Sequence, residues 1–269
     1  MSSFVIKIIA IITMTIDHIN YLLNKKFILN AIGRMAFPLF CYQIVVGYDK
    51  TKSLCKYIIR MIIFAIISQF PYYMFAKMAG NDIELNVIYT LTLGLITMFV
   101  YDLKVVNKNN KLVIVDKEDK TIFSKDIKYD KRLHVFISII KIVLLVLIML
   151  ISEVCKTEYG AWGIALMLFI HACYPFKNSI NLLGKNIKTK KIINNILFII
   201  GMLLMCIALY YKYVGVFKTM YVIIYILITF IPAFIMLLHN GKKGPGLKYF
   251  FYIYYPLQFL IIVLISYLK

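Results

Sequence analysis

Long runs of apolar residues follow one another along nearly the whole chain, separated by shorter polar stretches. A helix that crosses a bilayer needs roughly 20 predominantly apolar residues. Because an open sheet cannot satisfy its edge groups in lipid, such runs predict helices rather than strands. The pattern predicts an all-α, polytopic membrane helix bundle with about nine transmembrane spans. The expected spans are 4–23, 29–47, 54–76, 86–101, 133–154, 161–174, 192–211, 218–238 and 248–268.

Lysines and arginines are shared unevenly between the loops that join these spans. They are dense after the second, fourth, sixth and eighth spans and sparse in the alternate loops. Since cytoplasmic loops carry the excess of positive charge, this alternation predicts a cytoplasmic N-terminus. The longest lysine-rich loop, the polar insert 102–132, alternates apolar and polar residues, which is typical of a β-hairpin or a loose arm. We find no repeat or dividing linker, so residues 1–269 are expected to form a single integral membrane domain.

Composition supports a membrane protein and disfavours a nucleic-acid-binding protein. The chain has 269 residues, of which 62% are hydrophobic and 16% charged, and its formal net charge is +19. Such a charge can indicate nucleic-acid binding, but these lysines occupy the short loops where the positive-inside rule places them, so no nucleic acid is expected. The five cysteines are scattered without metal-ligand spacing, so no metal is expected. The first run lacks signal-peptide features, and we expect a multi-pass protein of the prokaryotic plasma membrane.

Asp17 and His18 lie side by side in the first span, roughly 20 Å from its inner end at 1.5 Å per residue. Ionisable groups inside spans are costly and commonly functional, and an imidazole exchanges protons near neutral pH. His18 is therefore a candidate catalytic residue, with packing against a neighbouring helix as the alternative. Adjacent helix residues point about 100° apart, so Asp17 is expected to pair with Arg34, as a structural or a catalytic contact. Asn86 and Glu158 are further candidates on the outward side.

A second polar cluster is expected on the inward side. The loop 239–246 combines three glycines with two lysines. Flexible backbone with cations can bind phosphate, although an ordinary positive-inside turn explains the same composition. The aromatic residues 249–252, which begin the last span, are expected on this side, and so is Lys7 of the first span. The inward candidates are Lys7, Asn240, Lys242, Lys243 and Tyr252.

Several short motifs occur in order along the chain. They are Lys7 to His18 (KIIAIITMTIDH), Ile32 to Phe40 (IGRMAFPLF), Ile67 to Tyr72 (ISQFPY), Leu85 to Val87 (LNV), Glu158 to Gly163 (EYGAWG), Asn240 to Gly244 (NGKKG) and Phe250 to Leu257 (FFYIYYPL). Together they resemble the TraX family of membrane proteins, known for N-acetylation of pilin in conjugative systems. The likeness extends over almost the whole chain and implies acetyl transfer without fixing the acceptor.

The basic residue Lys7, ten intervening positions and His18 also resemble the opening of the wider acyltransferase-3-like superfamily. That likeness implies transfer from a cytoplasmic coenzyme A thioester to an acceptor at the other face. Two positions depart from the TraX pattern: Gln258 stands where a histidine is usual, and Glu158 where an aspartate is common. Since glutamine cannot shuttle a proton, we assign no catalytic role to Gln258.

These observations lead to the hypothesis of an integral membrane acyltransferase that moves acetyl from cytoplasmic acetyl-CoA to an amine or hydroxyl at the outer side. The inward lysines would bind the phosphates, and His18 would act as general base or carry the acetyl group. Asn86 or Gln69 would donate a hydrogen bond to the oxyanion, and Glu158 would meet a cationic acceptor. The acceptor itself, whether protein, peptide, glycan or small molecule, stays open. The alternative is a non-enzymatic membrane assembly factor for a conjugative or secretion apparatus.

Overall fold

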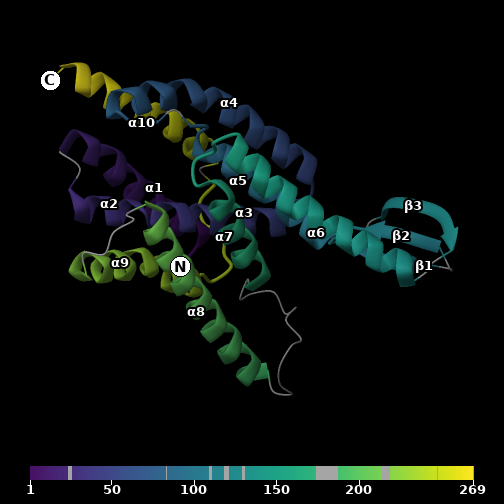
Figure 1. The fold of residues 1–269 in the computed structure, drawn as a ribbon. Coiled ribbons are helices and arrows are strands. Elements are labelled where there is room, and N and C mark those ends of the chain that lie inside the picture. The colour runs from purple at the N-terminus through teal and green to yellow at the C-terminus, as the bar shows by residue number, and fades with distance from the viewer. Residues whose placement is uncertain are drawn as a thin grey trace.

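The computed structural model describes residues 1–23, 26–82, 84–108, 111–117, 121–128, 131–173, 187–213, 219–246 and 248–268. Figure 1 shows the arrangement of its helices and of one small sheet. The helices are α1 (Ser3–Asn20), α2 (Phe27–Gly33), α3 (Ala36–Lys50), α4 (Leu54–Ala79), α5 (Val87–Asp102), α6 (Lys131–Val154), α7 (Gly160–Cys173), α8 (Ile187–Tyr213), α9 (Thr219–Leu237) and α10 (Lys248–Leu268). A short 3-10 helix, η1 (Tyr21–Leu23), follows α1. The strands are β1 (Lys104–Lys108), β2 (Lys111–Val115) and β3 (Thr121–Lys128).

Each predicted span contains helix in the part of the chain that the structure describes. The second span consists of two helices, α2 and α3, with an interruption at Arg34 and Met35. Within the described residues, four stretches are long and apolar enough to cross a membrane: Ser3–Leu23, Phe27–Lys50, Leu54–Ala79 and His134–Val154. The shorter apolar helices are Val87–Asp102, Gly160–Cys173, Ile192–Ala208, Val222–Leu237 and Tyr252–Leu268. A helical membrane protein is thus confirmed, whereas nine crossings and the cytoplasmic N-terminus stay predictions.

Helix ends that the lysine pattern assigns to one side of the membrane lie together. At the predicted inner end, the backbone of Ser3 donates a hydrogen bond to the carbonyl of Lys242 at 2.9 Å. The side chain of Lys50, at the end of α3, donates to the same loop before α10 at 2.6 Å. At the predicted outer end, the backbone of Leu85 ahead of α5 donates to Lys156 behind α6 at 3.0 Å. This grouping is what antiparallel consecutive spans produce.

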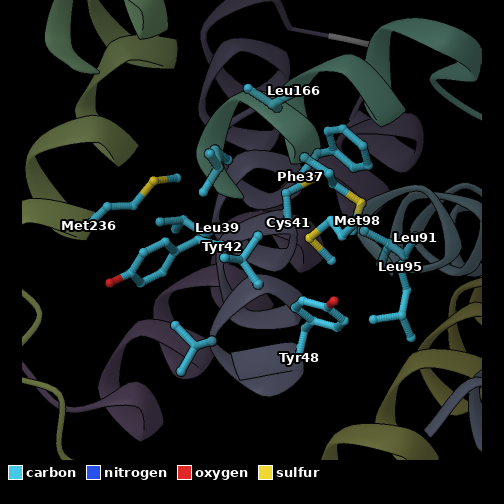
Figure 2. Close-up of a cluster of buried hydrophobic side chains, with 14 of the residues drawn as sticks. Phe37, Leu39, Cys41, Tyr42, Tyr48, Leu91, Leu95, Met98, Leu166 and Met236 are labelled. Atoms are coloured by element: carbon cyan, nitrogen blue, oxygen red, sulfur yellow. The ribbon is translucent and has the colours of Figure 1, made fainter. Parts of the chain in front are cut away.

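The centre of the protein is α3, and Figure 2 shows the apolar side chains around it. In the spanning stretch that contains α3, 61% of the residues in the most apolar window are buried, compared with 6% for α6. The buried cluster includes Phe37, Leu39, Cys41, Tyr42 and Tyr48 of α3, Leu91, Leu95 and Met98 of α5, Leu166 of α7 and Met236 of α9. The polar groups discussed below are therefore positioned by a packed apolar core.

The polar insert forms a three-stranded antiparallel sheet in the order β1-β2-β3. The sequence predicts a β-hairpin or a loose arm here, and the structure has strands, one more than a hairpin contains. The sheet lies beside the end of α6 (Figure 1), and Lys117 behind β2 donates a hydrogen bond to the carbonyl of Tyr48 on α3. The apolar side chains of α6 face outward along most of its length. In a bilayer such a helix surface contacts lipid, because burying apolar groups in hydrocarbon costs nothing.

Two native cysteines provide a test of orientation. Cys55, in the first turn of α4, and Cys155, just behind α6, are both exposed. The lysine pattern places Cys55 at the cytoplasmic end and Cys155 at the outer end. On whole cells, we expect a membrane-impermeant maleimide to label a variant that keeps only Cys155 and to leave unlabelled a variant that keeps only Cys55. Permeabilised cells, in which both should react, are the control, and the reverse labelling would overturn the orientation.

Candidate active site

α1 and α2 come close together at the first candidate residue. A Cβ placed on Gly33 would lie 2.2 Å from the Cβ of Asp17, closer than real atoms approach. A residue with a side chain at Gly33 would therefore push the two helices apart. The carboxylate of Asp17 accepts a hydrogen bond from the amide of Asn30 at 3.4 Å. Asp17 is thus held at the junction of α1 and α2.

Arg34 lies at the interruption between α2 and α3 and reaches the segment before α7. Its Nη1 donates to the hydroxyl of Tyr159 at 3.2 Å, and its guanidinium carbon lies 6.0 Å from the centroid of that ring. The opposite charges of Arg34 and Asp17 attract each other. The two residues that the sequence predicts to pair therefore belong to one site, together with Tyr159.

The imidazole of His18 packs among aromatic rings. Its centroid lies 5.2 Å from that of Phe75 on α4 and 4.6 Å from that of Phe259 on α10. The side chain of Gln258 approaches the same imidazole and accepts a hydrogen bond from Thr15 at 3.4 Å. Among the described residues, the buried Nδ1 of His18 has no hydrogen-bond partner. Buried polar atoms usually have partners, so this nitrogen is suited to a bound ligand.

Glu158 lies between α6 and α7, at the predicted outer end of the site. Its backbone donates to the carbonyl of Leu85 at 2.9 Å, which fixes the segment against the start of α5. Burial raises the pKa of the Glu158 carboxyl to about 7, although the guanidinium of Arg34 opposes this rise. The negative charges of Glu84 and Asp17 contribute further to the raised pKa. Near neutral pH the carboxyl is consequently shared between its protonated and ionised forms.

Asp17, His18 and Glu158 line one small cavity of about 30 Å³, which we call the polar cavity. A volume of this size is enough for about one or two water molecules or a small polar group. The remaining walls are Met14, Gly33, Ala36, Phe37, Phe40, Val87, Tyr159 and Tyr255. Glu158, distant in the sequence, is thus brought together with Asp17 and His18.

A larger cavity of about 210 Å³, which we call the apolar cavity, adjoins the polar cavity. The two have Met14, Phe40, Val87 and Tyr255 in common. The other walls of the apolar cavity are Lys7, Ile11, Gln43, Ile44, Gly47, Tyr57, Met61, Ile88, Leu91 and Tyr252. On α1 the lysine and the histidine are roughly 16 Å apart at 1.5 Å per residue. The two adjoining cavities therefore extend along α1 from Lys7 to Asp17 and His18.

Asn86 begins α5 and lines neither of these cavities. Its side-chain oxygen accepts a hydrogen bond from the backbone of Ile88 at 3.0 Å and caps the helix. Its Nδ2 donates to the carbonyl of Ala65 and to Oε1 of Gln69, both at 2.8 Å. Since both amide hydrogens are used within the protein, the structure gives Asn86 a capping position instead of the expected oxyanion contact. Gln69 belongs to the same structural network.

The loop 239–246 packs against the beginning of α1. Backbone amides of α1 donate to the carbonyls of Lys242 and Lys243 at 2.9 and 3.1 Å, and the amide of Lys242 donates to Asn240 at 3.0 Å. The side chains of these three loop residues are exposed. The positive charge of Lys243 acts on that of Lys7 in the wall of the apolar cavity. The loop therefore extends the positive charge at the inner end of that cavity.

Comparison with known proteins decides the family. A family model described as "TraX protein" matches residues 2–266. The chain belongs to the TraX family. The match includes every candidate residue and both cavities, so the site described above lies wholly within the TraX region. No solved structure matches the chain.

Two curated proteins are similar to parts of this TraX chain. "Probable fimbrial assembly protein FimC, serogroup H1" of Dichelobacter nodosus is 31% identical over 113 residues, which are 37% of this chain and 46% of the relative. "Uncharacterized protein RP591" of Rickettsia prowazekii (strain Madrid E) is 42% identical over 66 residues, 24% of each chain. The aligned stretches thus cover less than half the length of either relative. The first name assigns fimbrial assembly to the Dichelobacter protein.

Sequence reasoning missed the aromatic walls of the TraX site. Tyr159 and Tyr255 line the polar cavity, and Phe40 separates it from the apolar cavity as a wall of both. All three lie within stretches that carry the family likeness, and that signal could have identified them. Gln258, at the position where a histidine is usual, lies beside His18. Its departure from the family pattern therefore falls within the site itself.

The raised pKa of Glu158 leads to a prediction for the variant Glu158→Gln. The pKa of this carboxyl is about 7 in the folded protein and 4.5 in its ordinary state. Its contribution to stability is therefore complete below pH 4.5 and is lost as the pH rises through 7. Glutamine avoids that loss. Allowing for partial solvent contact, we expect the free energy of unfolding of Glu158→Gln to be about 2 kcal/mol higher than that of the wild type near pH 8. Near pH 4.5 the two free energies should be equal. Unfolding in detergent at both pH values measures this.

The control for this measurement is Asp82→Asn, because Asp82 is an exposed carboxylate between α4 and α5 at the same end. It should give the same difference from wild type at both pH values. A Glu158→Gln variant that is less stable than wild type near pH 8 would show that the ionised carboxylate is stabilising, contrary to this expectation.

Proposed function

We propose that this TraX protein is a membrane acetyltransferase, which takes acetyl from cytoplasmic acetyl-CoA and delivers it to an amine or hydroxyl at the outer side. The observation that carries the proposal is the adjacency of the two cavities along α1. The apolar cavity has Lys7 in its wall, and the polar cavity has Asp17 and His18. A donor entering from one side and an acceptor from the other would meet beside His18 without either crossing the membrane.

The walls of the apolar cavity suit the pantetheine arm of acetyl-CoA. They are mainly aliphatic and aromatic, with the hydroxyls of Tyr57 and Tyr252 as polar groups. Nε2 of Gln43 is buried in this wall and has no hydrogen-bond partner among the described residues. A pantetheine carbonyl would satisfy this donor. At the inner end, Lys7 and Lys243 would attract the phosphates of the coenzyme through charge-assisted hydrogen bonds.

Two routes of transfer are compatible with this geometry. In the direct route, the acceptor's lone pair attacks the thioester carbonyl carbon while His18 takes the acceptor's proton. The C–S bond of the tetrahedral intermediate then breaks, and the coenzyme A sulfur leaves with the proton that His18 returns. In the covalent route, a nitrogen of His18 attacks first and coenzyme A leaves as the thiol. The acceptor then displaces the imidazole from the acetyl group, so both routes give coenzyme A and acetylated acceptor.

The carboxyl groups of the polar cavity favour an acceptor that carries positive charge. Asp17 and Glu158 line the cavity with His18, and Arg34 lies beside them. An ammonium group would be attracted by these carboxylates and must lose a proton before it can attack. The likeness of Lys7 and His18 to the acyltransferase-3-like opening supports the same direction of transfer.

The second candidate function is a non-enzymatic factor for assembly of a pilus or a conjugative apparatus. The name of the Dichelobacter relative, a probable fimbrial assembly protein, favours it. In that case Asp17, His18 and Arg34 would stabilise the packing of α1, α2 and α3, and the apolar cavity would have no coenzyme to bind.

Thermal unfolding in detergent with acetyl-CoA or adenosine separates the two candidates. A ligand that binds only the folded state stabilises it by about 2.7 kcal/mol at a concentration 100 times its dissociation constant. We expect acetyl-CoA to raise the unfolding temperature and adenosine, which lacks the phosphates and the pantetheine arm, to leave it unchanged. An unchanged temperature with both ligands would favour the assembly factor.

Removing the two loop lysines tests the inner end of the coenzyme path. We expect Lys242→Gln/Lys243→Gln to raise the apparent Michaelis constant for acetyl-CoA about tenfold, with turnover at saturation nearly unchanged, because uniform binding is lost. Backbone groups hold the loop against α1, and both lysine side chains are exposed, so the substitutions should leave the fold intact. The matched control is Lys52→Gln/Lys56→Gln, which removes two exposed lysines at the same end. Equal constants in both variants would remove the loop from the coenzyme site.

A further inference from the structure

A third cavity, of about 490 Å³, lies between the inner end of α5, the strands β1 and β2, and α6. It has no wall residue in common with the apolar or the polar cavity. α6 contributes residues at spacings of three and four that form one stripe on a helix: His134, Ile137, Ser138, Ile140, Lys141 and Leu144. The volume falls within the range of about 300–1,000 Å³ that is typical of ligand sites. We call it the α5–α6 cavity.

Two lysines give this cavity a cationic wall. Lys141 is partly buried, and its Nζ donates to the carbonyl of Leu103 at 3.1 Å and lies 5.3 Å from the centroid of the Tyr101 ring. An ammonium group has three donors, and among the described residues Leu103 takes one of them, which leaves two for an anion. Lys104, the first residue of β1, is exposed beside it. Lys141 is therefore held in place by the protein while it retains capacity for a negatively charged ligand.

Asp102 is the carboxylate that acts on Lys141, and it has other partners. Its Oδ1 bonds to Nε2 of His171 at 2.9 Å, and its Oδ2 accepts a hydrogen bond from the hydroxyl of Tyr48 at 3.0 Å. Both oxygens also bond toward α7 and α3, so Asp102 offsets part of the positive charge of Lys141, while Lys104 adds a second positive charge at the α5–α6 cavity.

The apolar wall of the cavity continues onto the lipid-facing surface of the protein. Ile140 and Leu144 line the cavity and are nevertheless 41% and 42% exposed. The rest of α6 also presents apolar side chains outward, and a bilayer would cover them with lipid. A lipid molecule in the bilayer would therefore have access to this cavity from within the membrane.

We propose that the α5–α6 cavity binds an anionic phospholipid. Its phosphate contacts Lys104 and Lys141, and one acyl chain lies against Ile137 and Leu144. The lysine distribution assigns this end of α6 to the cytoplasmic side, where anionic lipids create a negative surface and attract lysines near the membrane. The lipid would fill the angle between the helices and the sheet. It would thereby join the insert to the membrane surface.

Native mass spectrometry of the delipidated full-length protein in detergent tests this proposal. The probes are dioleoyl phosphatidylglycerol, dioleoyl phosphatidylcholine and glycerol 1-phosphate, which has the phosphate without the chains. We expect phosphatidylglycerol to bind at least about tenfold more tightly than phosphatidylcholine, and glycerol 1-phosphate at millimolar concentration not to displace it. Lys104→Gln/Lys141→Gln should weaken phosphatidylglycerol binding about 30-fold, since each lysine near an anionic membrane surface is worth roughly a factor of five.

The matched control removes the same charge elsewhere at this end: Lys52→Gln/Lys56→Gln should change the affinity by less than about twofold. The glutamine at 141 keeps a donor for Leu103, and thermal unfolding verifies the fold. Should the double variant not fold, Lys104→Glu alone changes only an exposed side chain and should still weaken binding about fivefold or more. Equal losses in the variant and control pairs, no preference for phosphatidylglycerol, or displacement by glycerol 1-phosphate would each overturn the proposal.

Discussion

Replacing His18 with alanine is expected to lower acetyl transfer by about 10²–10⁴-fold while acetyl-CoA binding stays close to that of the wild type. General acid–base assistance contributes about this factor to enzymatic rates, and loss of a covalent acetyl-imidazole would cost at least as much. Binding should persist because the coenzyme's contacts lie along the apolar cavity, whose walls do not include His18. Single-turnover acetyl transfer and the thermal shift with acetyl-CoA measure the two quantities on the same purified protein.

The packing of His18 makes a second variant necessary. Alanine removes ring contacts with Phe75 and Phe259 as well as the proton-transfer group. His18→Phe keeps an aromatic ring of similar size and should be as inactive as the alanine variant but more stable. Ile19→Ala changes the neighbouring, 39% exposed side chain and should leave both rate and fold near wild type. An His18→Phe protein that folds, binds acetyl-CoA and transfers acetyl at a tenth of the wild-type rate or faster would exclude both catalytic roles.

The helices of this protein could be predicted from the sequence because their determinants are local. Long apolar runs allow little but helix in lipid, and each predicted span does contain helix in the described residues. The lysine alternation also predicted which helix ends would lie together, as Lys50 and the loop before α10 illustrate. The interruption at Arg34 was not foreseen, although Pro38 is a signal for it, because proline has no N–H to donate to the carbonyl of Arg34 four residues earlier.

The candidate site was predicted in part, and the missing part depends on packing between distant segments. Asp17, His18 and Glu158 were chosen because charged groups beside or within spans are costly, and the structure brings them to one cavity. Tyr159 and Tyr255 are ordinary aromatic residues until the fold places them at that cavity. The same reasoning overestimated Asn86, since a polar residue at the start of a span is equally suited to capping a helix.

The inner and outer candidate residues can act in one reaction only because the apolar and polar cavities lie between them. The loop lysines alone would be an ordinary positive-inside turn, and a histidine alone could be a packing residue. A cavity that passes from Lys7 toward Met14 and adjoins the polar cavity relates the two clusters. The function proposed above therefore depends on that passage being used by a ligand, and the passage can be closed without altering any charged or catalytic group.

Closing the apolar cavity with Ile44→Trp should reduce acetyl transfer by about 10²-fold or more and should also abolish the thermal shift with acetyl-CoA. Ile44 is a partly buried residue of α3 that lines this cavity and not the polar one. The larger indole would occupy the space proposed for the pantetheine arm, and displacement of a reacting group by about 1 Å is enough for a loss of this size. Overpacking costs about 1–3 kcal/mol of stability, which a folded domain can tolerate.

The His18 and Ile44 variants are thus expected to affect different steps, so together they separate loss of acetyl transfer from loss of acetyl-CoA binding. His18→Phe should bind acetyl-CoA and fail to transfer acetyl, whereas Ile44→Trp should not bind it at all. Ile66→Trp, at a 60% exposed position of α4, is the control for an added indole and should match the wild type in both assays. If Ile44→Trp is folded and still binds acetyl-CoA with wild-type affinity, the coenzyme does not enter through the apolar cavity. His18 would then have to receive its donor by another path, since the adjacent cavities would no longer connect it with the inner lysines.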